Sequence, residues 1–85
     1  MSTVTQLSIA DRVAKVIREQ AATFGVRLDD VPASYNLTLD AGFDSLDLVE
    51  ATMALEDEFG IEVDDEVMWG WQTVQQIIDH VNTKI

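Results

Sequence analysis

The chain has 85 residues, 47% of them hydrophobic, no cysteine, and a formal net charge of −11 at pH 7. This length is enough for one core but not for a catalytic cleft between two lobes, and disulfides and thiolate metal sites are excluded. No apolar run could span a bilayer and residues 1–12 lack the features of a secretory signal, so we expect a single cytoplasmic domain over residues 1–85, with an ordered helical core at about 8–83.

A first helix is predicted to begin after Ser8, because Ser8 and Asp11 have the spacing of a capping box. Gly25 is suited to end this helix in the left-handed conformation. Apolar residues recur at helical spacing between these points, and they predict the face that packs on the core: Ile9, Val13, Val16, Ile17 and Phe24.

A long connection follows, from about Val26 to Asp44. Within it, the run Asp29 to Pro32 is typical of a turn. An unanchored loop of this length is unusual in a compact domain, so we expect its apolar residues to attach it to the core. These residues are Leu28, Val31, Tyr35, Leu37 and Leu39.

The second helix is predicted from Ser45 to Phe59, with Asp44 as its N-cap and Gly60 as its end. The acidic run Asp64-Asp65-Glu66 suits the first turn of a short third helix, because acids are favoured at the positive end of the helix dipole. Gly70 should end this helix.

Thr73 and Gln76 form another capping box and predict a fourth helix. Its core face consists of Val74, Ile77, Ile78, Val81 and Ile85. The predicted fold class is therefore all-α, a four-helix bundle with three longer helices, one short third helix and a long first loop. We expect Trp71 in the core, while the sequence leaves the position of Trp69 open.

The stretch from Asp40 to Glu50 holds the residues with the clearest functional pattern. It does not match a calcium-binding loop, because Gly42, Ser45 and Ala51 stand where that loop needs an oxygen ligand, a glycine and a second oxygen ligand. We expect no metal site.

Ser45 does not match a hydrolase nucleophile either. Phe43 and Asp47 stand where the nucleophile elbow has glycines. His80 is the one histidine in the chain, so a small hydrolase would lack a credible base and oxyanion hole. We therefore expect no catalytic residue and no enzyme activity.

The run Gly42-Phe43-Asp44-Ser45-Leu46 resembles the attachment motif of the acyl carrier proteins, which is a glycine, a variable residue, and Asp-Ser-Leu. The likeness extends from the first helix to the fourth. Its further matches are Asp47, Val49, Glu50, Met53 to Glu56, Glu58-Phe59, Val74-Gln75 and Ile78-Asp79.

This resemblance implies that Ser45 receives 4′-phosphopantetheine from coenzyme A, with Asp44, Gly42 and Leu46 completing the attachment site. The thiol of the arm then carries acyl groups between enzymes. The implied partners are a phosphopantetheinyl transferase and then acyltransferases, ketosynthases and other acyl-processing enzymes. We expect a discrete monomer.

The position of Ser45 agrees with this assignment. A serine at the start of a helix lies near unpaired backbone N–H groups, where a phosphodiester is stabilised by about 0.3–1 kcal/mol. We expect Gly42 to leave room beside the serine for the transferase. The alternative is that Asp44 and Ser45 form only a helix cap.

The second helix has two contrasting faces. Leu48, Thr52, Leu55 and Phe59 cluster on the side expected to face the core. The other side combines apolar residues with carboxylates and suits a transient docking surface, unless Leu46 and Met53 lie under the long loop. We define the docking face as Leu46, Asp47, Glu50, Met53, Glu56 and Asp57.

The charge distribution favours protein partners. Only Asp11 and Glu19 of the sixteen carboxylates precede Leu28, and no lysine or arginine lies between Leu28 and Thr83. Such a surface repels nucleic acid and anionic membranes and attracts proteins with basic patches. Taken alone, however, the acidic composition is better explained as a means of keeping the protein soluble than as a signal for basic partners.

Two functions follow as hypotheses. The first is an acyl carrier protein of fatty acid synthesis or of a dedicated polyketide or specialised lipid pathway. The alternative is an unmodified acidic interaction module that docks through the second helix. Modification of Ser45 distinguishes them, since only the carrier requires it.

Overall fold

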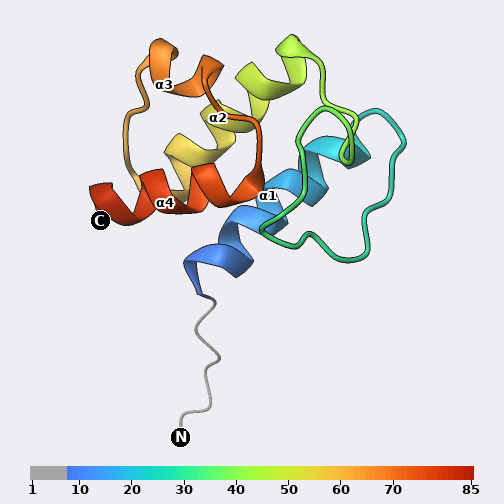
Figure 1. Cartoon of the computed structure of the whole chain (residues 1–85), viewed down its shortest axis with the longest axis horizontal. Coiled ribbons are helices and arrows are strands. Elements are labelled where there is room, and N and C mark those ends of the chain that lie inside the picture. Colours follow the sequence, from blue (N-terminus) through green and yellow to red (C-terminus); the bar gives the residue numbers. More distant parts are fainter. Residues whose placement is uncertain (1–7) are drawn as a thin grey trace, which may run out of the picture.

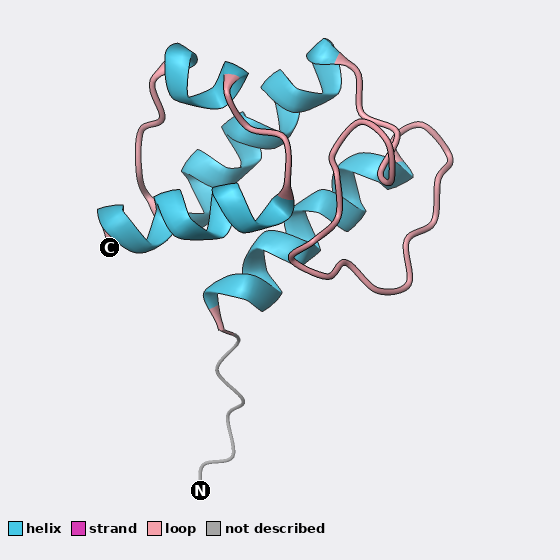
Figure 2. Ribbon diagram, viewed as in Figure 1, coloured by secondary structure: helices cyan, strands magenta, loops and turns pink. Residues whose placement is uncertain are grey.

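The computed structural model describes residues 8–85, so the first seven residues of the predicted 1–85 domain lie outside it. Within the described part the elements are α1 (Ile9–Ala22), α2 (Ser45–Phe59), α3 (Asp65–Trp69) and α4 (Val74–Lys84). Figure 1 shows how these helices are arranged, with α3 much the shortest, and Figure 2 shows that the rest of the described chain is loop. The predicted all-α fold is confirmed.

The core lies where α1 meets its two neighbours. α1 packs against both α2 and α4, while α3 packs against α2 (Figure 1). The largest fully buried side chains come from α1, α2 and α4: Val13, Ile17, Leu55, Val74, Ile77 and Val81. Trp71 joins this core as predicted.

Three helices begin with reciprocal capping boxes. The two predicted ones pair Ser8 with Asp11 and Thr73 with Gln76. A third box opens α2, where Asp44 pairs with Asp47 in the same way. Each box satisfies backbone N–H groups that have no partner inside the helix, which explains why the helices start where the sequence predicts.

The predicted end of α2 is confirmed, and Gly25 has the left-handed conformation predicted for it, although the last helical residue of α1 lies earlier than expected. Gly60 caps α2 in the left-handed conformation. α1 ends at Ala22, and Gly25 has a φ of +81° but lies beyond the helix. The N–H groups of Phe24 and Val26 both bond to the carbonyl of Ala21, so a tight turn replaces the expected last helical turn.

Three apolar residues predicted to be buried are exposed. Phe24 lies in the turn after α1, so it leaves the core-facing stripe. Leu39 is 83% exposed because it sits in a surface turn, where its N–H bonds to the Asn36 side chain. Ile85 is exposed because α4 ends one residue earlier.

The long connection is fixed to the start of α4 mainly by backbone hydrogen bonds. The N–H of Leu37 donates to the carbonyl of Gln72 (2.8 Å), and the N–H of Val74 donates to the carbonyl of Tyr35 (3.0 Å). An antiparallel bridge joins Asn36 and Thr73. Of the predicted apolar anchors, Val31 and Leu37 are buried, and Leu28 and Tyr35 pack partly on the core.

Candidate functional site

Ser45 is the first residue of α2, and its side chain is exposed. Asp44, not Ser45, caps the helix: Asp44 Oδ1 accepts the N–H of Asp47 (2.9 Å), and Asp47 Oδ2 accepts the N–H of Asp44 (3.1 Å). Within residues 8–85 no protein hydrogen bond uses the Ser45 hydroxyl. The hydroxyl therefore has no capping role and can be reached from solvent.

A left-handed residue precedes the cap. Gly42 has a φ of +79°, which disfavours any residue with a side chain. A Cβ added there would lie 3.8 Å from Cε2 of Phe24, which is ordinary van der Waals contact. Within the chain itself, the requirement for glycine here is thus the backbone conformation and not a close contact; the room it leaves for a transferase stays a prediction.

The turn after Gly42 leads the chain from the loop into α2. Phe43 is buried, its N–H donates to the carbonyl of Leu37 (2.9 Å), and its ring meets that of Phe24 edge to face at 6.1 Å. Because Leu37 is bonded in turn to Gln72, the start of α2 is held in place from the side of α4.

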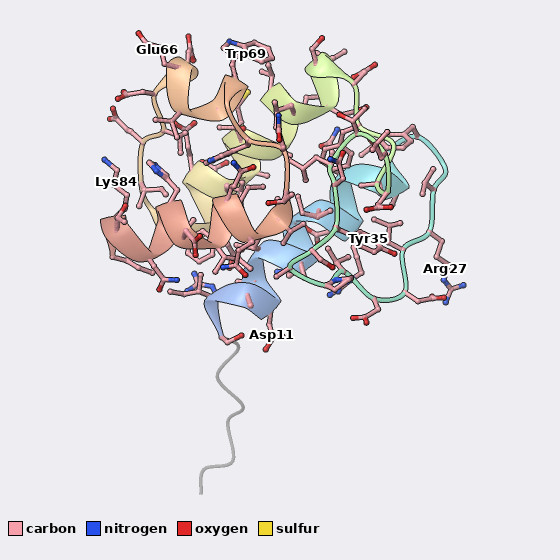
Figure 3. All side chains as sticks on the ribbon, viewed as in Figure 1. Asp11, Arg27, Tyr35, Glu66, Trp69 and Lys84 are labelled. Atoms are coloured by element: carbon pink, nitrogen blue, oxygen red, sulfur yellow. The ribbon has the colours of Figure 1, made fainter. Side chains whose placement is uncertain are left out.

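A hollow of about 350 Å³ opens beside Ser45. Its lining is mainly apolar and aromatic: Leu37, Thr38, Phe43, Asp44, Ser45, Leu48, Trp69 and Trp71. Trp71 is only 8% exposed and belongs to the core, whereas Trp69 is 55% exposed and projects from the outer edge of the bundle (Figure 3).

Trp69 also lines a second hollow of about 250 Å³ on the α2 side. Thr52 and Met53 contribute to its wall. The Thr52 hydroxyl donates to the carbonyl of Leu48 (2.7 Å), so its hydrogen-bonding capacity is used within the helix. Trp69 is therefore shared by two apolar hollows.

The docking face is partly free and partly engaged. Leu46 and Met53 are 63% and 60% exposed, so they do not lie under the loop. Glu50 and Asp57 are also exposed. Glu56 is half-buried, and its carboxylate accepts the N–H of Val63 (2.8 Å).

The pKa of Asp44 is lowered below its ordinary value of 3.8, first because its carboxylate accepts the backbone N–H of Asp47. Asp44 therefore remains charged in the folded protein at neutral pH.

Two features lie outside this site. Another hollow, of about 430 Å³, is lined by residues around the end of α1, and Arg18 and Arg27 are the charged ones. His80 packs edge to face on Trp71 (5.7 Å between ring centroids) and does not line the hollow at Ser45. Neither the hollow at the end of α1 nor the contact between His80 and Trp71 includes a residue predicted for the attachment site.

Gln20 is a residue at the site that the sequence did not predict. It is 7% exposed, and its Nε2 donates to Asp47 Oδ1 (3.1 Å) and to Glu50 Oε1 (2.8 Å). The sequence marks Gln20 in one way only: it is a polar residue within the apolar stripe of α1, between Ile17 and Phe24.

The described part of the chain contains no group of three His, Cys, Asp or Glu side chains that could hold a metal ion. Among residues 8–85, no helix has the length and hydrophobicity needed to cross a membrane.

Comparison with known proteins shows the family. The sequence model of the family described as the phosphopantetheine attachment site matches residues 12–81, which is most of the chain. The chain therefore belongs to this family, whose domain is the site of covalent 4′-phosphopantetheine attachment.

Solved structures agree with this assignment. A protein from Mycobacterium tuberculosis assigned as an acyl carrier protein is similar, with a TM-score of 0.82 and 25% identity over 92% of this chain and 100% of that chain. The crystal structure of an acyl carrier protein from Thermotoga maritima has a TM-score of 0.75 and 27% identity, covering 94% of each chain. The chain thus has the acyl carrier protein fold.

Proposed function

We propose that this protein is an acyl carrier protein that bears its 4′-phosphopantetheine on Ser45 and presents acyl thioesters to separate biosynthetic enzymes. The observation that carries the proposal is the exposed Ser45 hydroxyl on the first turn of α2, beside an apolar hollow and inside the family match. When bound, the arm supplies the thiol on which acyl groups are carried.

The residues around Ser45 fit this group. A phosphodiester on Ser45 Oγ would lie at the N-terminus of a 15-residue helix, where its negative charge is stabilised. The Asp44 carboxylate is turned toward the N–H of Asp47 and completes the cap. Gly42 supplies the left-handed turn that presents the serine at the surface.

Attachment of the arm needs a separate enzyme. Ser45 has no histidine or other base bonded to its hydroxyl within residues 8–85, so a phosphopantetheinyl transferase must remove the proton as the Oγ–P bond forms. Coenzyme A supplies the phosphopantetheine and loses its nucleotide part. The chain itself acts as carrier and not as catalyst.

The docking face supplies the means of recognition. Leu46 and Met53 are exposed apolar side chains, and Glu50 and Asp57 are exposed carboxylates on the same helix. Such a surface suits partner enzymes that combine apolar contacts with basic patches, including acyltransferases and ketosynthases. The proposal covers carriers of fatty acid synthesis and of dedicated polyketide or specialised lipid pathways alike.

The test is the intact mass after incubation with coenzyme A, magnesium and a broad-specificity phosphopantetheinyl transferase. Wild-type protein should gain one phosphopantetheine group and Ser45→Ala none. Ser34→Ala is the matched control, because Ser34 is an exposed serine in the loop, and it should be modified like the wild type. Folded wild-type protein that gains nothing would contradict the proposal and favour the unmodified docking module.

A further inference from the structure

The side-chain amide of Gln20 bridges two helices at the docking face. It reaches from α1 to Asp47 and Glu50, which are three residues apart and therefore on the same side of α2. An amide nitrogen has two N–H donors, so each carboxylate receives one of them. Gln20 is also among the few polar side chains that are buried.

Through Asp47, this contact extends to the start of α2. One oxygen of Asp47 accepts from Gln20, and the other accepts the N–H of Asp44. Asp44 is the residue before Ser45. A continuous series of hydrogen bonds therefore leads from the interior of α1 to the residue that precedes the attachment serine.

The contact holds the carboxylates without cancelling their charge. No ion pair within residues 8–85 involves Asp47 or Glu50, while Arg12 and Lys15 both lie near Glu58, at the opposite end of α2. A lysine or arginine in place of Gln20 would neutralise the pair, and a glutamate would add repulsion and supply no donor. A neutral double donor is thus the group that fixes both side chains and leaves both charges for a partner.

We infer that Gln20 is a positioning residue for partner recognition: it fixes the Asp47 and Glu50 carboxylates, and through Asp47 the N-terminus of α2, in the geometry that basic partner enzymes bind. The inference rests on the proposed carrier function and names a determinant of its docking step. Carboxylates that are ordered before binding lose less side-chain entropy on docking, so Gln20 acts on affinity and not on the chemistry at Ser45.

The test is the kinetics of phosphopantetheine transfer to Gln20→Met, which has a similar length but no donor. The KM for the carrier should rise about three- to tenfold while kcat stays within about twofold of the wild type. Gln20→Asn retains the amide on a shorter side chain and should give an intermediate KM. Glu19→Met, at an exposed neighbouring position, is the matched control and should leave both constants unchanged.

A double-mutant comparison separates positioning from loss of structure. Gln20→Met should have no further effect on KM when Asp47→Asn and Glu50→Gln are already present, because the groups it orients have lost their charge. Circular dichroism and thermal unfolding establish that each variant is folded. If Gln20→Met does not fold, the KM of Gln20→Asn is compared with that of the wild type instead.

Each other result decides against the inference. An unchanged KM in folded Gln20→Met, or an equal loss in both backgrounds, would overturn it while the carrier function stands. Wild-type protein that accepts no phosphopantetheine would overturn the carrier function and this inference together.

Discussion

Arg12 and Glu58 join the first part of α1 to the end of α2 by two hydrogen bonds. Arg12 Nε donates to Glu58 Oε2 (2.8 Å), and Arg12 Nη2 donates to the backbone carbonyl of Glu58 (2.7 Å). The guanidinium also lies 4.4 Å from the centre of the Phe59 ring. One side chain thus combines an ion pair, a bond to a free carbonyl near the helix end, and a cation–π contact.

Arg12→Ala should lower the free energy of unfolding by about 1–2 kcal/mol, because all three interactions are lost together. Chemical denaturation at neutral pH measures this. Arg27→Ala is the control, since Arg27 projects from the long loop (Figure 3) and, among the described residues, pairs only with exposed Asp29 at 3.7 Å. A loss as large for Arg27→Ala would show that overall charge, not the Arg12 contacts, determines the effect.

The ion pair between Arg12 and Glu58 should make the stability of the fold depend on pH. The hydrogen bond from Arg12, assisted by Lys15, lowers the pKa of Glu58 below its ordinary value of 4.5. A carboxyl with a lowered folded pKa stabilises the fold fully above its unfolded pKa, and the contribution is lost as the pH falls through the folded value. The stability difference between wild type and Glu58→Gln should therefore be constant from pH 7 to about 5 and disappear at lower pH.

Urea unfolding of both proteins between neutral and strongly acidic pH measures this difference directly. Glu19→Gln, at an exposed position, should show no such difference at any pH. A gap between wild type and Glu58→Gln that persists below the folded pKa would mean that the substitution acts through packing.

Leu46 and Met53 should affect docking but not folding. Replacing both with alanine removes mostly exposed apolar area, so thermal unfolding should change little, while the KM for phosphopantetheine transfer should rise about five- to fiftyfold. Steady-state kinetics with the transferase measures the effect. Leu39→Ala, an exposed leucine outside the docking face, is the control, and an equal loss there would argue against a defined face.

The two tryptophans should differ in stability cost. Trp71→Ala should destabilise the protein by about 3–5 kcal/mol because the side chain is buried in the core, whereas Trp69→Ala should cost no more than about 1 kcal/mol. Denaturant titration followed by circular dichroism compares the two variants. Equal costs would contradict the placement of Trp69 at the surface.

Gly42→Ala should destabilise the turn before α2 by about 1–2 kcal/mol, because alanine is disfavoured at positive φ. The free space around the site accommodates a methyl group, so the cost comes from the backbone. Incorporation of D-alanine at this position should remove the penalty, and the comparison of melting temperatures checks it. A penalty of equal size for D-alanine would point to a steric cause instead.

The helices could be predicted from sequence because their signals are local. Capping residues placed the starts of α1, α2 and α4, the acidic run placed the start of α3, and Gly60 and Gly70 placed the ends of α2 and α3. Phe24 shows the limit of this approach: its spacing continues the stripe of α1, but the helix ends at Ala22 and Phe24 lies in a tight turn closed by local backbone hydrogen bonds.

The candidate site was predictable only in part for a similar reason. Ser45 and its cap lie within one short segment, so their motif is visible in the sequence. Gln20 acts on Asp47 across 27 positions, and no local pattern indicates which residue of α2 it meets. Only its polarity on an apolar stripe marks it as unusual.

The long loop is held by bonds between main-chain atoms, from Leu37 to Gln72 and from Val74 to Tyr35. Main-chain groups are present whatever residue occupies a position, proline excepted. Exposed positions of this loop that do not line the hollow beside Ser45, such as Ser34, can therefore vary or accept a label without moving Ser45. The part of the chain that looks least regular is thus a natural place to diversify or engineer this carrier.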